Sequence, residues 1–175
     1  MWAEPRAPTK TPLQTKKLTP EEVKSLYESH GAALAAYACC FGLDHASAED
    51  IVHQLFLKIL GVREFAPETP VAYLYGATRN ASLNRRRDRQ RETALADTET
   101  WFTHPHRSYE EILNLQNALK QLPEEQRETV YLKVWAGMTF LEVSALTGTP
   151  SNTVASRYRY ALEKLREKLA QRSSK

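Results

Sequence analysis

The sequence predicts an all-α protein made of two small helical domains joined by a flexible linker. Apolar residues recur at three- and four-residue spacing, which is typical of amphipathic helices, and Thr19, Ser108 and Thr139 each precede a Glu by three residues, as helix-capping side chains do. The helical period is lost between these two regions, where the charge turns acidic and His104-Pro105-His106 interrupts the chain. The predicted organisation is a flexible basic, Pro-containing tail at 1–18, a first domain at 19–91, a linker at 92–107 and a second domain at 108–172.

Composition limits the classes of protein that fit. The chain has 175 residues, 42% of them hydrophobic and 26% charged, with a net charge of only +3. The distribution of charge is more informative, because six arginines lie between residues 79 and 91 against the single acid Asp88. No apolar run is long enough to span a membrane, so we expect no membrane insertion and a cytoplasmic protein. Cys39 and Cys40 are helix neighbours that point in different directions, which excludes a disulfide between them.

Three helices are predicted in the first domain. Thr19 caps a helix that continues to about Gly42, and Ser47 with Asp50 caps a second one. A third begins with Thr69 as cap and runs to about Gln90, apolar in its first half and arginine-rich in its second. The predicted inward stripe of the second helix is Ile51, Val52, Leu55, Phe56, Ile59 and Leu60.

The arginine-rich third helix suggests contact with opened DNA. Aromatic rings can stack on bases while guanidinium groups pair with phosphates. A solvated, arginine-rich helix end is the alternative interpretation. In the linker, Trp101 and Phe102 suggest docking on a partner or on one of the domains.

The second domain ends in a predicted helix-turn-helix. Two helices, with Ile112 and Leu119 on the first and Val130, Tyr131, Val134 and Trp135 on the second, form a platform for it. Thr139 starts a short helix, Gly148 and Pro150 break it, and Ser151 caps the last helix. One side of this last helix is apolar and the other is polar, as in helices that read the major groove. An ordinary amphipathic hairpin is the alternative. The polar side carries Asn152, Thr153, Ser156, Arg159 and Tyr160, with Arg157 at its edge.

Enzyme activity, a metal and a cofactor are not expected. The chain offers no recognisable set of nucleophile, base and orienting group. His104 and His106 lack a third or fourth ligand at usable spacing, so no metal site is predicted there.

Four stretches carry a family resemblance. Residues 122–166 read LPEEQRETVYLKVWAGMTFLEVSALTGTPSNTVASRYRYALEKLR and resemble the C-terminal domain (region 4) of the extracytoplasmic-function sigma factors of the sigma-70 family. The stretches LYESHGAALAAYA, AEDIVHQLFLKIL and AYLYGATRNASLNRRR are similar, in the same order and spacing, to the N-terminal domain (region 2) of that family. The resemblance implies an RNA polymerase specificity subunit that catalyses no reaction itself.

The resemblance also implies a polymerase-binding surface on the second helix. In the family, the helix matching 48–60 docks on the clamp coiled coil of the largest polymerase subunit. The family pattern there is Asp-x-x-Gln-Glu-x-Phe, and one acid is missing here, so the contact is expected to be weaker or differently tuned. The implied residues are Asp50, His53, Gln54, Phe56 and Lys58.

Two further implied sites face promoter DNA. The third helix and the loop 63–69 resemble the element that opens the minus-ten region and captures a flipped base. Tyr73 stands where the family often has a core Trp, so a structural role competes with DNA contact at that position. The implied minus-ten residues are Tyr73, Tyr75, Arg79, Asn80, Asn84, Arg85, Arg86 and Arg87.

For the minus-35 element, the family's base-reading positions fall on the last helix. The family often has a basic residue where Ala155 stands, so a different recognised sequence is expected. Arg127 and Arg157 are expected on phosphates. The implied minus-35 residues are Arg127, Asn152, Thr153, Ala155, Ser156, Arg157, Arg159 and Tyr160.

The implied partners are the RNA polymerase core enzyme, promoter DNA and an anti-sigma factor. Two other classes of protein fit the same patterns. One is a helix-turn-helix regulator that binds duplex DNA without polymerase, and the other is a sigma mimic that acts only by protein interaction.

Overall fold

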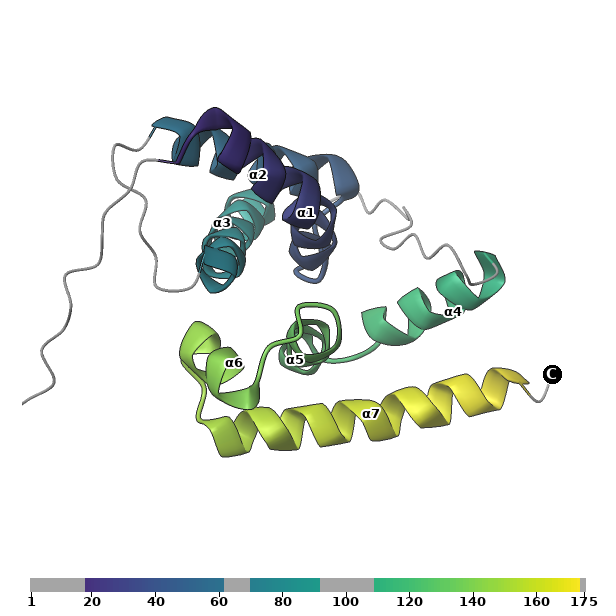
Figure 1. Ribbon diagram of the computed structural model, residues 1–175. Coiled ribbons are helices and arrows are strands. Elements are labelled where there is room, and N and C mark those ends of the chain that lie inside the picture. Colours follow the sequence, from purple (N-terminus) through teal and green to yellow (C-terminus); the bar gives the residue numbers. More distant parts are fainter. Residues whose placement is uncertain (1–17, 62–69, 92–108, 174–175) are drawn as a thin grey trace, which may run out of the picture.

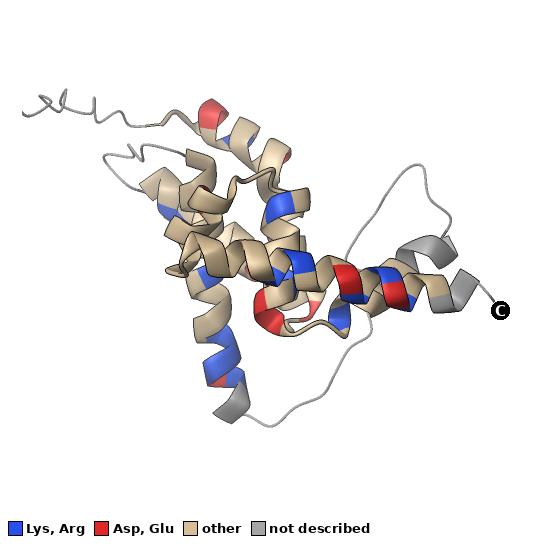
Figure 2. Ribbon diagram, turned by 90° about the horizontal axis from the view of Figure 1, so that it is seen from below, with Lys and Arg blue, Asp and Glu red and all other residues tan. Residues whose placement is uncertain are grey.

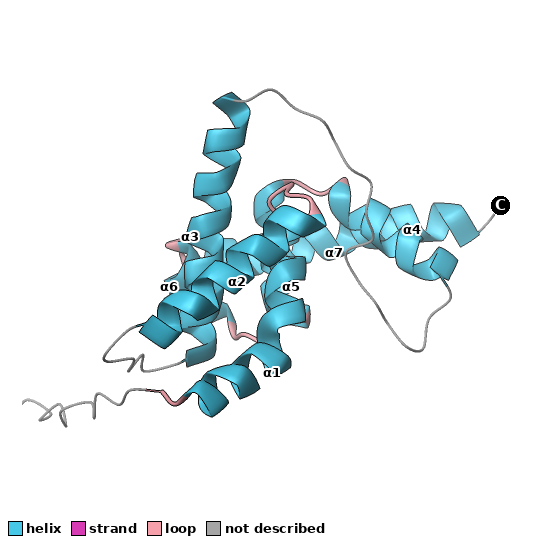
Figure 3. Ribbon diagram, turned by 90° about the horizontal axis from the view of Figure 1, so that it is seen from above, coloured by secondary structure: helices cyan, strands magenta, loops and turns pink. Residues whose placement is uncertain are grey.

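The helices form two layers in the computed structural model, which describes residues 18–61, 70–91 and 109–173 (Figure 1). All regular elements in these ranges are helices, which confirms the all-α prediction (Figure 3). Four parts of the chain lie outside the described residues: the tail at 1–17, the loop with Thr69, the linker with Trp101, Phe102, His104 and His106, and the cap at Ser108. The helices are α1 (Pro20–Cys39), α2 (His45–Gly61), α3 (Pro70–Arg91), α4 (Tyr109–Lys120), α5 (Glu124–Val134), α6 (Phe140–Thr147) and α7 (Ser151–Ser173).

The start of α1 is fixed by the predicted capping box. The backbone N–H of Thr19 donates to Glu22 Oε2 at 2.8 Å, and the N–H of Glu22 donates to Thr19 Oγ1 at 3.2 Å. The helix ends at Cys39, three residues before the predicted end, and the chain turns at Gly42 with a φ of 80°. All residues from 34 to 41 are buried, so the second half of α1 is the centre of the upper layer.

The start of α2 differs from the prediction. The side chain of Asp44 accepts a hydrogen bond from the N–H of Ser47 at 2.8 Å, and its carbonyl accepts from Ala48 N at 3.0 Å. The helix therefore begins at His45 under an Asp44 cap, and the prediction that Ser47 caps it was wrong. The predicted inward stripe is buried except for Leu60, which lies at an exposed edge.

The helix-turn-helix has the predicted local geometry. Thr139 and Glu142 form the capping box of α6, and Gly148 ends that helix in the left-handed region with a φ of 67°. The backbone N–H of Val154 donates to Pro150 O at 3.0 Å, so the cap of α7 lies one residue before the predicted Ser151. The apolar side of α7 is buried at Val154, Ala161 and Leu165.

Helix α5 lies between the two layers and contacts both (Figure 1). Its Tyr131 hydroxyl donates to Ala33 O of α1 at 2.7 Å, and its ring lies 5.5 Å from that of Tyr37, centroid to centroid. On the same helix, Val130 and Tyr131 are buried, whereas Val134 is exposed. The sequence patterns do not foresee the contact of α5 with α1, which joins the two halves of the chain.

Candidate nucleic-acid and polymerase interfaces

The basic half of α3 projects beyond the bundle (Figure 3) and carries most of the predicted minus-ten residues. Asn80, Asn84, Arg85 and Arg87 are exposed there, as DNA contact requires. The Nη2 of Arg87 donates to Asn84 Oδ1 at 3.2 Å, which orients both side chains along the same face. This face is polar, cationic and accessible.

Two of the predicted minus-ten arginines are held by acids of α5. The Nε of Arg79 donates to Glu128 Oε1 at 2.7 Å, and Arg86 pairs with Glu124. Partial burial acts to lower the pKa of Arg79, but the hydrogen bond and charge of Glu128 outweigh it and raise that pKa. Arg79 is therefore firmly cationic and already has an anionic partner within the chain.

The two tyrosines at the start of α3 have different environments. Tyr75 is 2% exposed and its ring meets that of Tyr37 edge-on, with centroids 5.2 Å apart, so burial raises its pKa to about 12. The expectation that Tyr75 is available to DNA is therefore wrong in this arrangement. Tyr73 is 45% exposed, so it is less buried than the core position expected from the family's Trp. A base could stack on Tyr73 but not on Tyr75.

The outer face of α7 is open in the lower layer (Figure 2). Asn152, Thr153, Arg159 and Tyr160 are all exposed on it. The guanidinium of Arg159 lies 5.0 Å from the ring centroid of Tyr160, a cation–π contact that holds the side chain at the surface. The structure thus brings the predicted minus-35 side chains together.

The remaining predicted minus-35 residues are less exposed. Ala155, Ser156 and Arg157 are half-buried, and the Ser156 hydroxyl donates to Asn152 O at 2.9 Å. The Nη1 of Arg157 donates to Thr149 Oγ1 at 3.3 Å, next to the turn. Arg127 turns inward, with Nη1 3.4 Å from Lys120 O, a contact that competes with the phosphate contact expected for it.

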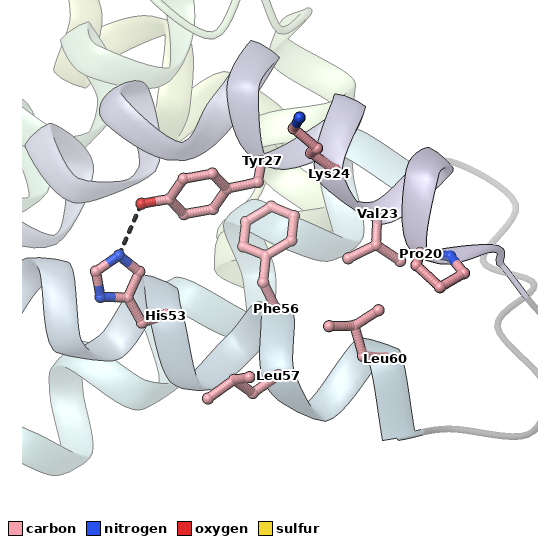
Figure 4. A pocket seen from close by; sticks show the side chains of 8 residues that line it. All are labelled: Pro20, Val23, Lys24, Tyr27, His53, Phe56, Leu57 and Leu60. Atoms are coloured by element: carbon pink, nitrogen blue, oxygen red, sulfur yellow. Dashed lines mark hydrogen bonds between the residues drawn. The ribbon is translucent and has the colours of Figure 1, made fainter.

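An apolar groove of about 490 Å³ lies between α1 and α2 (Figure 4). Phe56 is buried at its floor, where its ring meets Tyr27 edge-on with centroids 5.2 Å apart. Leu57 is 66% exposed at its rim. An apolar surface of this kind on a helix pair is suited to a protein partner. The lining residues are Pro20, Val23, Lys24, Tyr27, His53, Phe56, Leu57 and Leu60.

The predicted polymerase-binding residues lie on α2 beside this groove. Asp50, Gln54 and Lys58 are exposed, and their spacing places them on one side of the helix together with Leu57. The Nε2 of His53 lies 2.7 Å from the Tyr27 hydroxyl, which ties the wall of the groove to α1. Leu57 and Tyr27 were not predicted as site residues, although an apolar residue outside the inward stripe of α2 is a signal that could have identified Leu57.

Two further observations concern the described residues alone. Within 18–61, 70–91 and 109–173, no three His, Cys, Asp or Glu side chains gather in a way that could hold a metal ion. Over the same ranges, no helix combines the length and apolar character that crossing a membrane requires.

Two known families match the chain. Residues 26–92 match the family described as sigma-70 region 2, and residues 108–165 match sigma-70 region 4. The ECF RNA polymerase sigma factor SigL of Mycobacterium tuberculosis is 28% identical over 153 residues, which cover 82% of this chain and 86% of SigL. The ECF RNA polymerase sigma factor EcfG of Rhodopseudomonas palustris is 30% identical over 142 residues, which cover 76% of this chain and 77% of EcfG.

Two solved structures share the fold. The sigma factor RpoE in complex with the anti-sigma factor NepR, from Bartonella quintana, aligns with a TM-score of 0.73 at 23% identity, covering 86% of this chain and 98% of RpoE. CnrH in complex with the cytosolic domain of CnrY aligns with a TM-score of 0.63 at 24% identity, covering 87% of this chain and 90% of the other. At these identities the likeness concerns the fold.

Proposed function

Because the chain belongs to the extracytoplasmic-function sigma factors of the sigma-70 family, we propose that it directs RNA polymerase core enzyme to specific promoters. The observation that carries the proposal is the presence, in one chain, of an apolar groove at α2 and of two helices, α3 and α7, with exposed polar and basic side chains. The chain supplies specificity and catalyses no reaction itself. Since RNA polymerase is its partner, its proposed place of action is the cytoplasm.

The groove beside α2 is the proposed polymerase-binding surface. Exposed Leu57 offers apolar area, and Asp50, Gln54 and Lys58 offer polar contacts at the rim. Such an arrangement of an apolar centre with a polar rim is typical of protein interfaces. Phe56, which is buried, supports the floor of the groove and does not reach the partner.

The two DNA-facing helices have different proposed roles. The exposed side chains of α3, with Tyr73 at its start, suit single-stranded minus-ten DNA, because rings stack on bases and arginines pair with phosphates. The outer face of α7 suits base edges of a minus-35 element in the major groove, where Arg159 can donate two hydrogen bonds to a guanine.

An anti-sigma factor is the proposed regulator. RpoE and CnrH, which share the fold, were each solved in complex with a protein partner, NepR and the cytosolic domain of CnrY respectively. The apolar groove between α1 and α2 is a surface that such a partner could cover in competition with polymerase.

Co-elution with core polymerase on gel filtration tests the proposal. Wild type is expected to co-elute, and Leu57→Glu is expected to weaken co-elution because it places a charge in the apolar groove. Ala46→Glu is the matched control, since it adds the same charge to an exposed position of α2 outside the groove. A wild-type chain that binds duplex DNA but ignores core polymerase would favour the helix-turn-helix regulator instead. Run-off transcription then separates a sigma factor from a sigma mimic.

A further inference from the structure

The side chain of Tyr27 on α1 is held by residues of both helices at one end of the apolar groove (Figure 4). Its hydroxyl lies 2.7 Å from His53 Nε2 of α2, and the two rings are stacked with centroids 5.6 Å apart. Phe56, also on α2, meets the Tyr27 ring edge-on at 5.2 Å. Two ring contacts and a hydrogen bond at the tip hold the side chain close to one rotamer. Tyr27 is therefore fixed, although it is 38% exposed.

The third contact of the Tyr27 ring is with Gly31, one turn farther along α1. Gly31 is buried, and a Cβ at this position would lie 3.3 Å from Cε2 and 3.4 Å from Cδ2 of Tyr27. Carbon atoms prefer a separation of about 3.5 to 4.0 Å, so a larger residue would push the ring away from α1. Glycine weakens a helix interior relative to alanine, and here it permits the close approach of the ring.

The two ends of the groove differ in chemistry. Tyr27 and His53 form a polar end, while Pro20 and Leu60 line the opposite, apolar end (Figure 4). Nε2 of His53 is engaged by Tyr27, and the second ring nitrogen, Nδ1, points away from that bond (Figure 4). His53 is exposed, so Nδ1 is the nitrogen that a bound partner can reach. The contact with Tyr27 thus determines which edge of the imidazole faces outward.

His53 lies within the face of α2 that the proposed function assigns to polymerase. It follows Asp50 by three residues and precedes Leu57 by four, and this spacing places all three on one side of the helix. Ordering a side chain on binding costs conformational entropy, and a side chain that is already ordered in the free protein avoids that cost. An imidazole held by Tyr27 is therefore preorganised for a partner.

We propose that Tyr27 is a positioning residue of the polymerase-binding surface, and that it raises the affinity for core polymerase by fixing the orientation of His53. The inference rests on the proposed function, because core polymerase is the partner whose affinity it concerns. Tyr27 acts through His53, so the loss of its hydroxyl has no further effect once the imidazole is removed.

A double-mutant cycle on the full chain tests the proposal. Tyr27→Phe removes the hydroxyl and keeps the ring, His53→Ala removes the imidazole, and a third variant carries both changes. The dissociation constant of the complex with core polymerase is measured for each protein. Tyr158→Phe is the matched control, because it removes a hydroxyl from a tyrosine of α7 whose ring packs on Phe140, outside the groove. Far-UV circular dichroism checks that helicity is retained.

Tyr27→Phe is expected to weaken binding about 3- to 10-fold, the range that ordering one side chain accounts for, while Tyr158→Phe binds as wild type does. In the His53→Ala background, Tyr27→Phe is expected to cause no further loss. Losses that multiply in the double variant would show that the Tyr27 hydroxyl acts independently of His53, and would overturn the proposal. A Tyr27→Phe protein that binds core polymerase as tightly as wild type would overturn it as well.

Nuclear magnetic resonance of the free chain tests the contact itself. At one fixed pH, Tyr27→Phe should shift the signal of the His53 Cε1 proton, and Gly31→Ala should shift it because the added Cβ displaces the Tyr27 ring. Gly76→Ala is the matched control, since it lies in helix α3 where an added Cβ meets no described atom within 4 Å, and it should leave the signal unchanged. An unchanged signal in both test variants would mean that Tyr27 does not hold His53, against the proposal.

The two measurements keep the hypotheses apart. If the wild-type chain does not bind core polymerase, the proposed function fails, and the spectra alone decide whether Tyr27 fixes His53. If all variants bind core polymerase equally tightly, the positioning role of Tyr27 fails and the proposed function stands.

Discussion

The two helices proposed to face DNA, α3 and α7, differ in the partners of their arginines. On α3, three arginines pair with acids outside the helix: Arg79 with Glu128, Arg86 with Glu124, and Arg89 with Asp44 at 2.5 Å. On α7, Arg159 stacks on the ring of Tyr160 and Arg157 bonds the hydroxyl of Thr149, both neutral partners. Figure 2 shows that the two helices also differ in position: α7 runs along the open lower side, and the basic end of α3 extends away from it.

The partner of an arginine determines whether its charge is already compensated within the chain. A neutral partner orients the guanidinium and leaves its charge uncompensated, as at Arg159 and Arg157 on the proposed major-groove face of α7. An acidic partner compensates the charge and must be displaced before a phosphate can bind, which concerns Arg79, Arg86 and Arg89 but not the exposed Arg85 and Arg87 of α3. Four substitutions test this contrast, in order of decreasing expected effect.

The largest effect is expected for Glu128→Ala. The change leaves Arg79 and the Tyr37 hydroxyl without their shared acceptor in a buried place, and breaking a buried charge pair costs about 3 kcal/mol. The free energy of unfolding from chemical denaturation measures the loss. Glu125→Ala, at an exposed position of α5, is expected to cost less than about 0.5 kcal/mol. Similar losses for the two variants would mean that the buried hydrogen bonds of Glu128 contribute no more to stability than the exposed side chain of Glu125.

Replacement of Arg159 should act on specificity. Arg159→Ala is expected to cost about 2 kcal/mol on the cognate minus-35 site and to relax the preference at one base position. Competition binding against a set of single-base variants of the site measures both effects. Arg166→Ala, at an exposed position farther along α7, is the control and should leave the preference unchanged.

Replacement of Asp44 tests the acid that pairs with Arg89 and caps α2. The hydrogen bond from the Ser47 N–H lowers the pKa of Asp44, with a further contribution from Arg89, so the stabilisation is present at neutral pH and is lost as the pH falls through that lowered pKa. Asp44→Ala should cost about 1 kcal/mol at pH 7, the usual value of an N-cap.

Denaturation curves of wild type and Asp44→Ala over a pH series check this expectation. The difference between the two proteins should shrink in acid, where the wild-type carboxyl becomes protonated. A difference that persists unchanged in acid would contradict the charged-cap interpretation.

The smallest effect is expected for Arg85→Ala. Arg85 is exposed on α3, so its loss should weaken binding to all single-stranded sequences alike and reduce the salt slope by about 0.7. Titrations at several salt concentrations measure the slope. If Arg85→Ala and Arg159→Ala instead caused equal losses on every sequence, the division between phosphate contact and base reading would be refuted.

Local features of the fold were predictable because their signals lie within a few residues. Thr19 with Glu22 and Thr139 with Glu142 form the expected capping boxes, and Gly148 takes the expected left-handed conformation. The start of α2 was harder to predict, because Asp44 and Ser47 are both residue types that cap helices. The earlier residue caps it, and its carboxylate also reaches Arg89, a partner 45 residues away that local spacing does not reveal.

The candidate sites were predictable where a helix packs on one side and less so where it packs on more than one. The outer face of α7 follows from its buried face, since α7 packs on one side only. On α3, Tyr73 and Tyr75 lie about 200° apart around the helix, so only one can face inward. Family analogy favoured Tyr73 for the inward position, but Tyr75 is the buried one. Glu128 is an ordinary acid in the sequence, and only the fold shows that Tyr37 and Arg79 meet it.

Both cysteines of the chain, Cys39 and Cys40, are buried at the end of α1. Burial raises the pKa of the Cys40 thiol, and Glu128 and Glu124 are near enough to raise it further against the opposing charge of Arg127. An alkylating reagent should therefore react with these thiols only during moments when the surrounding helices separate. The rate of alkylation of the unmodified protein would then measure how often the helices separate, with no dye or tag attached.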